Sequence, residues 1–192
     1  MSLLERVKRI LLTPKEEWPV IDAEPATVGS LYTGYIMPLA AIGPVAQAIG
    51  YSVFGYSVPF MRTYRTPVGT AITGAIVTYA LTLLGVYVLA LIIDWLAPNF
   101  NGSRNQIQAL KTAAYASTAS WVAGIFALVP GLRVLGILGL YSLYLLYLGL
   151  PVLMKAPQEK ALGYTVVVII AAIVLFLVIG LVAGTFMAGT LG

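Results

Sequence analysis

The sequence predicts an all-α, polytopic membrane protein: a bundle of five transmembrane helices preceded by a short N-terminal amphipathic helix. Hydrophobic residues make up 60% of the 192 residues and charged residues only 9%, whereas soluble globular domains have about 25% charged residues. Five apolar stretches each reach the length of about 20 residues that a helix needs to cross a bilayer. Nearly all of the charged residues lie in the short segments between these stretches.

The predicted spans cover residues 27–50, 67–96, 106–129, 132–154 and 162–189. Residues 1–25 are expected to form a cytoplasmic amphipathic segment, and residues 26–192 a single five-helix transmembrane domain.

The N-terminal segment has the pattern of a helix lying on a membrane. Ser2 and Glu5 have the spacing of a capping box, which marks a helix start. One helical face collects Leu3, Leu4, Val7, Ile10 and Leu11, opposite a face with Arg6, Lys8 and Arg9. Such a helix could place its basic side chains against anionic headgroups. Packing on the protein's own cytoplasmic loops is the alternative.

The first span contains Pro38 and Pro44. Each proline removes one backbone donor, so the helix is expected to kink or break there. Broken helices can line substrate sites in transporters, but proline is more frequent in membrane helices generally, so a purely structural kink is the preferred interpretation.

Small residues recur at four-residue spacing along three spans, which lets helix backbones approach closely in lipid. The series are Thr70, Gly74, Thr78 and Thr82; Ala109, Ala113 and Ser117, beside Ala116, Ser120 and Gly124; and Gly180, Gly184 and Ala188. We expect each series to be a contact face. For the last span the contact could lie within one chain or between protomers.

The third and fourth spans are expected to form an antiparallel hairpin, because residues 129–133 leave room only for a tight turn. Tyr141, Tyr144 and Tyr147 follow on the fourth span. Tyrosines near a helix end can anchor it at the membrane interface, or they can line a polar cavity. Tyr144 is therefore a candidate functional or structural residue.

Asp94 is the only acidic residue inside an apolar stretch. We expect it to be neutralised across the loop by Lys111 or Arg104, or else to be a polar lid or partner-binding point at the cytoplasmic face. The chain holds no histidine and no cysteine, and no catalytic set or phosphate-binding loop can be assembled. We therefore expect a protein that is not an enzyme and uses neither cofactor nor metal.

The basic residues favour one orientation in the membrane. With the N-terminus in the cytoplasm, the cytoplasmic segments hold Arg6, Lys8, Arg9, Lys15, Arg104, Lys111, Lys155 and Lys160, and the opposite side holds only Arg62, Arg65 and Arg133. The positive-inside rule prefers this arrangement. We expect a multi-pass protein of the cell membrane, the inner membrane in a prokaryote, with the C-terminus outside.

Two segments resemble the Yip1-domain family, in its prokaryotic branch. RILLTPKEEWPVIDAEPAT carries the family's pattern of Pro14, Trp18, Ile21 and Glu24 before the first span. The core residues that fall where the family's recurring residues do are Asp94, Pro98, Tyr115, Trp121, Pro130, Tyr144, Gly149, Pro151 and Lys155. The resemblance implies five membrane helices and a cytoplasmic N-terminus. Ser120 stands where relatives often carry proline.

Eukaryotic members of the family are associated with vesicle traffic and with small GTPases of the Rab type, a role that does not carry over to a prokaryotic chain on fold kinship alone. The leading hypothesis is a non-enzymatic membrane protein that organises the membrane or binds partner proteins or lipids. Its expected partners are membrane lipids and a second copy or another membrane protein, with no nucleic acid. The alternative is a small transporter or channel, which a polar cavity bordered by Tyr35, Pro38 and Tyr144 would favour.

The charge distribution makes a direct prediction about topology. A reporter that is active only in the cytoplasm should work when it is fused at Met1 and be silent when it is fused after Gly192, because the basic loops stay on the cytoplasmic side. The reverse pattern of reporter activity would contradict the orientation, and equal activity at both ends would contradict the odd number of spans.

Overall fold

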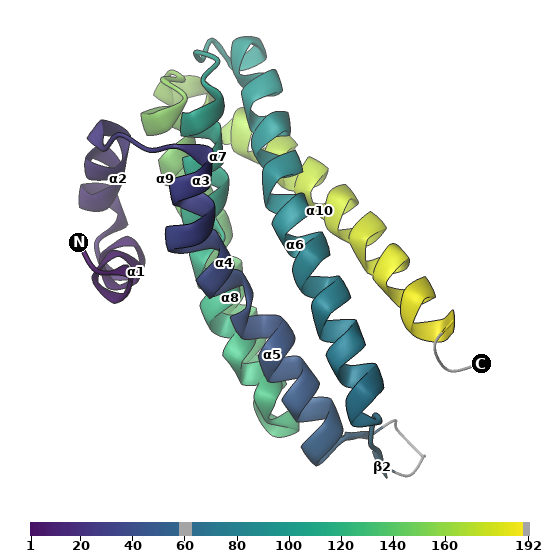
Figure 1. The fold of residues 1–192 in the computed structure, drawn as a ribbon. Helices are drawn as coiled ribbons and strands as arrows, with labels where there is room; N and C mark the ends of the chain where they lie inside the picture. Colours follow the sequence, from purple (N-terminus) through teal and green to yellow (C-terminus); the bar gives the residue numbers. More distant parts are fainter. Residues whose placement is uncertain (58–62, 190–192) are drawn as a thin grey trace.

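The structure is a computed structural model that describes residues 1–57 and 63–189, with side chains at 1–55, 65–181 and 184. Figure 1 shows a bundle of long helices with a smaller helical pair at its side. In the described part, extended structure is confined to the antiparallel pair β1 (Tyr56–Ser57) and β2 (Thr63–Tyr64). The all-α class is therefore confirmed for this part of the chain.

The helical pair consists of α1 (Leu3–Leu12) and α2 (Pro14–Ala23). The Ser2 hydroxyl accepts a hydrogen bond from the backbone N–H of Glu5 at 3.2 Å, which confirms the predicted start of α1. Pro14 occupies the first position of α2, where its missing N–H costs nothing. Both helices lie against the bundle near the end remote from the β1–β2 turn (Figure 1).

The first long segment is broken, as its prolines predict. It runs through α3 (Val28–Leu31), a π-helical stretch η1 (Tyr32–Ile36), α4 (Met37–Ala40), α5 (Ile42–Ile49) and a second π-helical stretch η2 (Gly50–Phe54). Pro38 directly follows the first π-helical stretch, and Pro44 follows a turn at Ala41. The breaks stand where the missing donors leave carbonyl groups without a helical partner.

Two helices of the bundle are unbroken, and most residues in the apolar stretch of each are not buried within the chain. The first, α6 (Val68–Leu96), ends in a 3₁₀ turn, η3 (Ala97–Phe100), and the left-handed Asn101 closes it with φ at 58°. The second is α10 (Gln158–Gly189). The two helices pack closely at Gly85, where an added Cβ would come within 2.7 Å of the Ile179 side chain.

The third segment differs from the prediction of a fifth apolar span. It is divided into α7 (Gln106–Ala116), α8 (Thr118–Ala123) and a 3₁₀ stretch η4 (Gly124–Leu128). Among the described residues, four helices are long and apolar enough to cross a membrane, and this segment is not one of them. Every residue from Ala109 to Ala116 is buried. Because these residues contact protein rather than lipid, the segment tolerates small and polar side chains that lower its apolarity.

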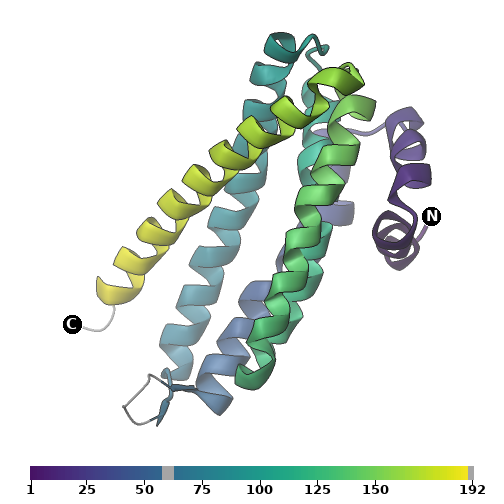
Figure 2. The ribbon, with the colours of Figure 1, turned by 180° about the vertical axis from the view of Figure 1, so that it is seen from behind.

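The third segment nevertheless runs along the bundle beside the fourth (Figures 1 and 2). The fourth consists of a 3₁₀ stretch, η5 (Pro130–Leu140), and α9 (Tyr141–Leu153). The hairpin prediction is confirmed. Close packing at the small residues of the third segment is confirmed as well, since a Cβ on Gly124 would lie 2.8 Å from the Cα of Gly43.

The glycine series of α10 has no such contact inside the described chain. A Cβ added at Gly180 or Gly184 would meet nothing within 4 Å among the described residues, and the side chain of Ala188 lies outside the description. Figure 2 shows α10 diverging from α9 toward this end. The predicted contact face therefore stays a prediction.

Candidate functional site

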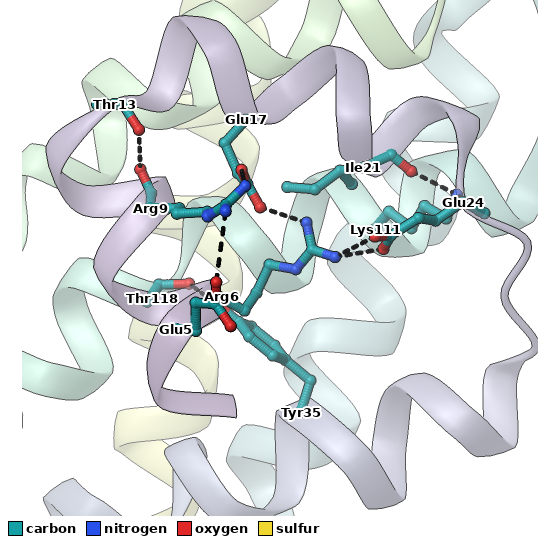
Figure 3. A network of polar contacts seen from close by, with 10 residues as sticks. All are labelled: Glu5, Arg6, Arg9, Thr13, Glu17, Ile21, Glu24, Tyr35, Lys111 and Thr118. Atoms are coloured by element: carbon teal, nitrogen blue, oxygen red, sulfur yellow. Dashed lines mark hydrogen bonds and ion pairs between the residues drawn. The ribbon is translucent and has the colours of Figure 1, made fainter. Parts of the chain in front are cut away.

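A buried polar cluster joins α1 and α2 to the bundle, and it is the most concentrated polar feature among the described residues (Figure 3). Its centre is Arg6, which is only 7% exposed. The sequence pattern placed Arg6 with Lys8 and Arg9 on an outward basic face, and for Arg6 this was wrong. Helical periodicity gives the angle between the side chains of one helix, but it does not show which other segment supplies an acidic partner. Here the acidic partners of Arg6 lie on its buried side.

Arg6 holds two glutamates at once. One guanidinium nitrogen donates to Glu17 and another to both carboxylate oxygens of Glu24. Glu17 is 2% exposed, so neither charge of this pair is stabilised by bulk water. Burial alone would lower the pKa of Arg6, but the hydrogen bonds to Glu24 and the two carboxylate charges outweigh burial and raise it. Arg6 is thus firmly cationic.

Aromatic rings pack against the polar cluster. The guanidinium carbon of Arg6 stands 5.8 Å from the ring centre of Tyr115, within cation–π range. Tyr115 in turn contacts Tyr35 at 4.4 Å and Trp18 edge-on at 6.4 Å between ring centres. Trp18 is fully buried, and a Cβ on Gly149 would lie within 2.6 Å of its ring. Because Gly149 has no side chain, the indole ring of Trp18 can pack directly against α9.

Lys111 fastens the end of α2 to α7. Its ammonium donates to the carbonyl oxygen of Ile21 at 2.8 Å and to that of Glu24. A cation at a helix C-terminus satisfies carbonyl groups that lack helical partners. The expectation that Lys111 neutralises Asp94 was therefore wrong, because the last turn of α2 occupies its ammonium group.

Asp94 pairs with the other expected partner. The Arg104 side chain donates to one oxygen of Asp94 at 3.2 Å, and Arg104 itself is 58% exposed in its side chain. The other oxygen of Asp94 is buried without a hydrogen-bond partner among the described residues. The pair belongs to the loop between α6 and α7 and is separate from the Arg6 cluster.

Further polar contacts hold the helical pair from other sides. The carboxylate of Asp22 accepts from Gln108 at 2.8 Å and from Lys155. The Tyr141 hydroxyl donates to the carbonyl of Leu11 at 3.1 Å. The N-terminal pair is therefore attached to both α7 and α9 rather than suspended by a linker.

The remaining candidate residues do not form one site. Pro38 is exposed, and Tyr144 is 40% exposed beside Tyr141. Pro44 is buried and lines a cavity of about 540 Å³ together with Gln47, Thr82 and Ser117. Neither Tyr35, Pro38 nor Tyr144 lines that cavity, so it is not the cavity that would have favoured a transporter.

A separate cavity of about 360 Å³ lies beside the Arg6 cluster and is bordered by Arg6, Glu24, Tyr35, Lys111 and Tyr115. The ionised groups on its wall are already engaged, the arginine by carboxylates and the lysine by carbonyl groups. Among the described residues no group of three potential metal ligands comes together. This arrangement is suited to holding helices in place and to offering a polar pocket.

The sequence reasoning missed Arg6, Glu17 and Trp18 as site residues. Trp18 and Glu24 could have been found, since both belong to the pattern that resembles the Yip1 family. The periodicity of α2 could have indicated Glu17, since it shares the helical face of Pro14, Trp18 and Ile21, whereas the exposed Glu16 does not.

The cluster predicts an asymmetry between two neighbouring arginines. Arg6→Gln should lower the free energy of unfolding by about 3–5 kcal/mol, because it removes the close partner of the buried Glu17 and leaves that carboxylate only the 3.9 Å contact with Arg9. Arg9→Gln should cost less than about 1 kcal/mol, because exposed ion pairs contribute little, and the pair of Arg9 with Glu5 is half exposed. Thermal unfolding in detergent measures both variants. Equal losses would show that the Arg6 pair is not buried in the native protein.

The comparisons with known proteins identify the family of the chain. The model of the Yip1 domain matches residues 8–180. Two curated relatives, both named Inner membrane protein YohC, from Escherichia coli strain K12 and from strain CFT073, are each 27% identical over 117 residues. The match covers 61% of this chain and 60% of each relative. No solved structure matches the chain. The chain belongs to the Yip1-domain family, as an integral membrane protein related to a bacterial inner membrane protein.

Proposed function

We propose that this chain is a non-enzymatic membrane protein that organises lipids and partner proteins at the cytoplasmic face, with α1 and α2 as a fixed platform. The observation that supports the proposal is the buried pairing of Arg6 with Glu17 and Glu24. A helix that merely rests on a membrane needs no such attachment to its own protein, whereas a platform that must hold its orientation does.

The outward side of the platform has the composition of a membrane-interface surface. Leu4 is 79% exposed and Leu12 is 69% exposed. Lys8 and Lys15 are exposed near them. Leu4, Lys8 and Leu12 follow one another at four-residue spacing, so they share one side of α1. Apolar side chains flanked by basic ones are typical of helices that lie in the headgroup region.

The orientation and the span count are part of the same proposal. With five crossings and the N-terminus inside, the platform and the Asp94–Arg104 pair face the cytoplasm. Anionic phospholipid headgroups are the first partner that this surface fits, since each nearby lysine or arginine adds about 1 kcal/mol of attraction. A second copy of the chain or another membrane protein could use the open side of α10 at Gly180 and Gly184.

Three features favour the absence of enzymatic activity. The chain has no histidine and no cysteine. The charged groups around Arg6 are engaged with one another, and Asp94, the one acid inside an apolar stretch of the sequence, pairs with an exposed arginine. The alternative, a small transporter or channel lined by the broken first helix and the fourth-helix tyrosines, has weaker support because Tyr144 does not border the cavity at Pro44.

Site-directed spin labels test the platform in vesicles that contain anionic phospholipid. Since the chain has no native cysteine, single labels at Leu4→Cys and Leu12→Cys can be compared with labels at the polar positions Lys15→Cys and Glu16→Cys. Collision with dissolved oxygen should dominate at Leu4 and Leu12, because these side chains would enter the lipid, and collision with an aqueous nickel complex should dominate at Lys15 and Glu16. Predominant access of the nickel complex at all four sites would refute a lipid-facing platform.

A further inference from the structure

A groove runs along the bundle between α9 and α10. Two adjoining cavities of about 460 and 540 Å³ form it, since both are lined by Ser120, Gly124, Ser142, Leu143, Ala172 and Phe176. Volumes of this size are typical of sites for small organic ligands. Ile173 and Phe176, on the α10 side, are 55% and 46% exposed, so the groove opens sideways to where lipid would lie.

Glycines keep the groove empty of the protein's own side chains. Gly136 and Gly139 lie on its wall in η5, and a Cβ at Gly136 would meet nothing within 4 Å among the described residues. The divergence of α10 from α9 (Figure 2) widens the space on the opposite wall. A slender apolar chain would find room there that a folded peptide segment would not.

Arg133 borders the groove at the turn between η4 and η5, at the end of the bundle remote from the N-terminal platform. Its guanidinium stands 4.6 Å from the ring centre of Tyr51. One terminal nitrogen of Arg133 is buried and has no hydrogen-bond partner among the described residues. Arg133 itself lines the groove, and a guanidinium presents a planar fork of donors that fits a phosphate.

The serine side chains in the middle of the groove need no ligand as a hydrogen-bond partner. The Ser120 hydroxyl donates to the carbonyl of Gly139 at 3.0 Å, and the Ser142 hydroxyl accepts from the backbone N–H of Ser120 at 3.0 Å. Their hydrogen bonds are therefore satisfied within the protein. The groove combines an apolar trough with one cationic donor at its end. This arrangement is complementary to an anionic lipid, which has an apolar acyl chain and a negatively charged headgroup.

We infer that this groove binds one anionic phospholipid, with its phosphate on Arg133 and an acyl chain between α9 and α10. The site lies at the other end of the bundle from α1 and α2, so it goes beyond the proposed platform and does not depend on it. In the predicted topology it would take lipid from the outer leaflet.

Native mass spectrometry of the purified protein in detergent tests the site with two phospholipids of identical acyl chains, phosphatidylglycerol and phosphatidylcholine. Both lipids carry a phosphate, but the choline ammonium of phosphatidylcholine offsets its charge. The anionic lipid should therefore be retained in preference by about fivefold, the gain expected from one basic residue beside an anionic headgroup. Arg133→Gln should abolish that preference. Arg65→Gln is the matched control: it removes an exposed charge from the same predicted side and should leave the preference intact.

A second variant keeps the test informative if Arg133→Gln fails to fold. Gly136→Leu should fold, since its Cβ has room, and should fill the groove and so lower retention of the anionic lipid by about tenfold. Equal retention of the two lipids by the unchanged protein would overturn the inference, as would equal loss of preference in Arg65→Gln. A fatty acid that competes as well as the phospholipid would overturn the assignment to a phosphate headgroup.

Discussion

The architecture depends on one interaction, the pairing of a buried arginine with two carboxylates brought by the next helix. Arg6 and Glu17 are both buried, and burying a charge is costly unless it is paired, so the ion pairs of Arg6 with Glu17 and Glu24 offset the cost of enclosing them. The pairing fixes the angle between α1 and α2. Trp18 then inserts against Gly149, and Lys111 closes the end of α2. A segment that hydropathy alone separates from the membrane domain is thereby made part of it.

Much of the architecture follows from patterns along the chain. The helix start at Ser2, the breaks around Pro38 and Pro44, the tight hairpin after η4 and the pairing of Asp94 with Arg104 are local events, set by residues close in sequence. The partners of Lys111 were not predictable, because they lie about 87 or more positions away in the sequence. The burial of Arg6 was not predictable either, because it depends on which face of α1 meets the bundle. Periodicity gives an amphipathic helix its two faces but does not say which of them the protein covers.

The third segment shows the same limit in another way. A count of apolar residues treats every membrane helix as exposed to lipid, whereas α7 is enclosed by its neighbours and carries alanines, a threonine and a lysine where an exposed helix would need leucine. The small residues of the third segment make close contacts between helices, as the approach of Gly124 in η4 to Gly43 shows. The two ends of the bundle thus differ: buried ion pairs attach α1 and α2 at one end, and a groove bordered by Arg133 lies at the other.

The central claim is that α1 and α2 are a rigid part of the membrane domain, and a distance measurement between two spin labels tests it most directly. Leu4 and Trp95 are both well exposed, on α1 and α6, and the absence of native cysteine makes Leu4→Cys with Trp95→Cys a unique pair. In lipid bilayers the pair should give one narrow distance distribution. A broad distribution would contradict the account, because it would mean that the N-terminal helices move independently of the bundle.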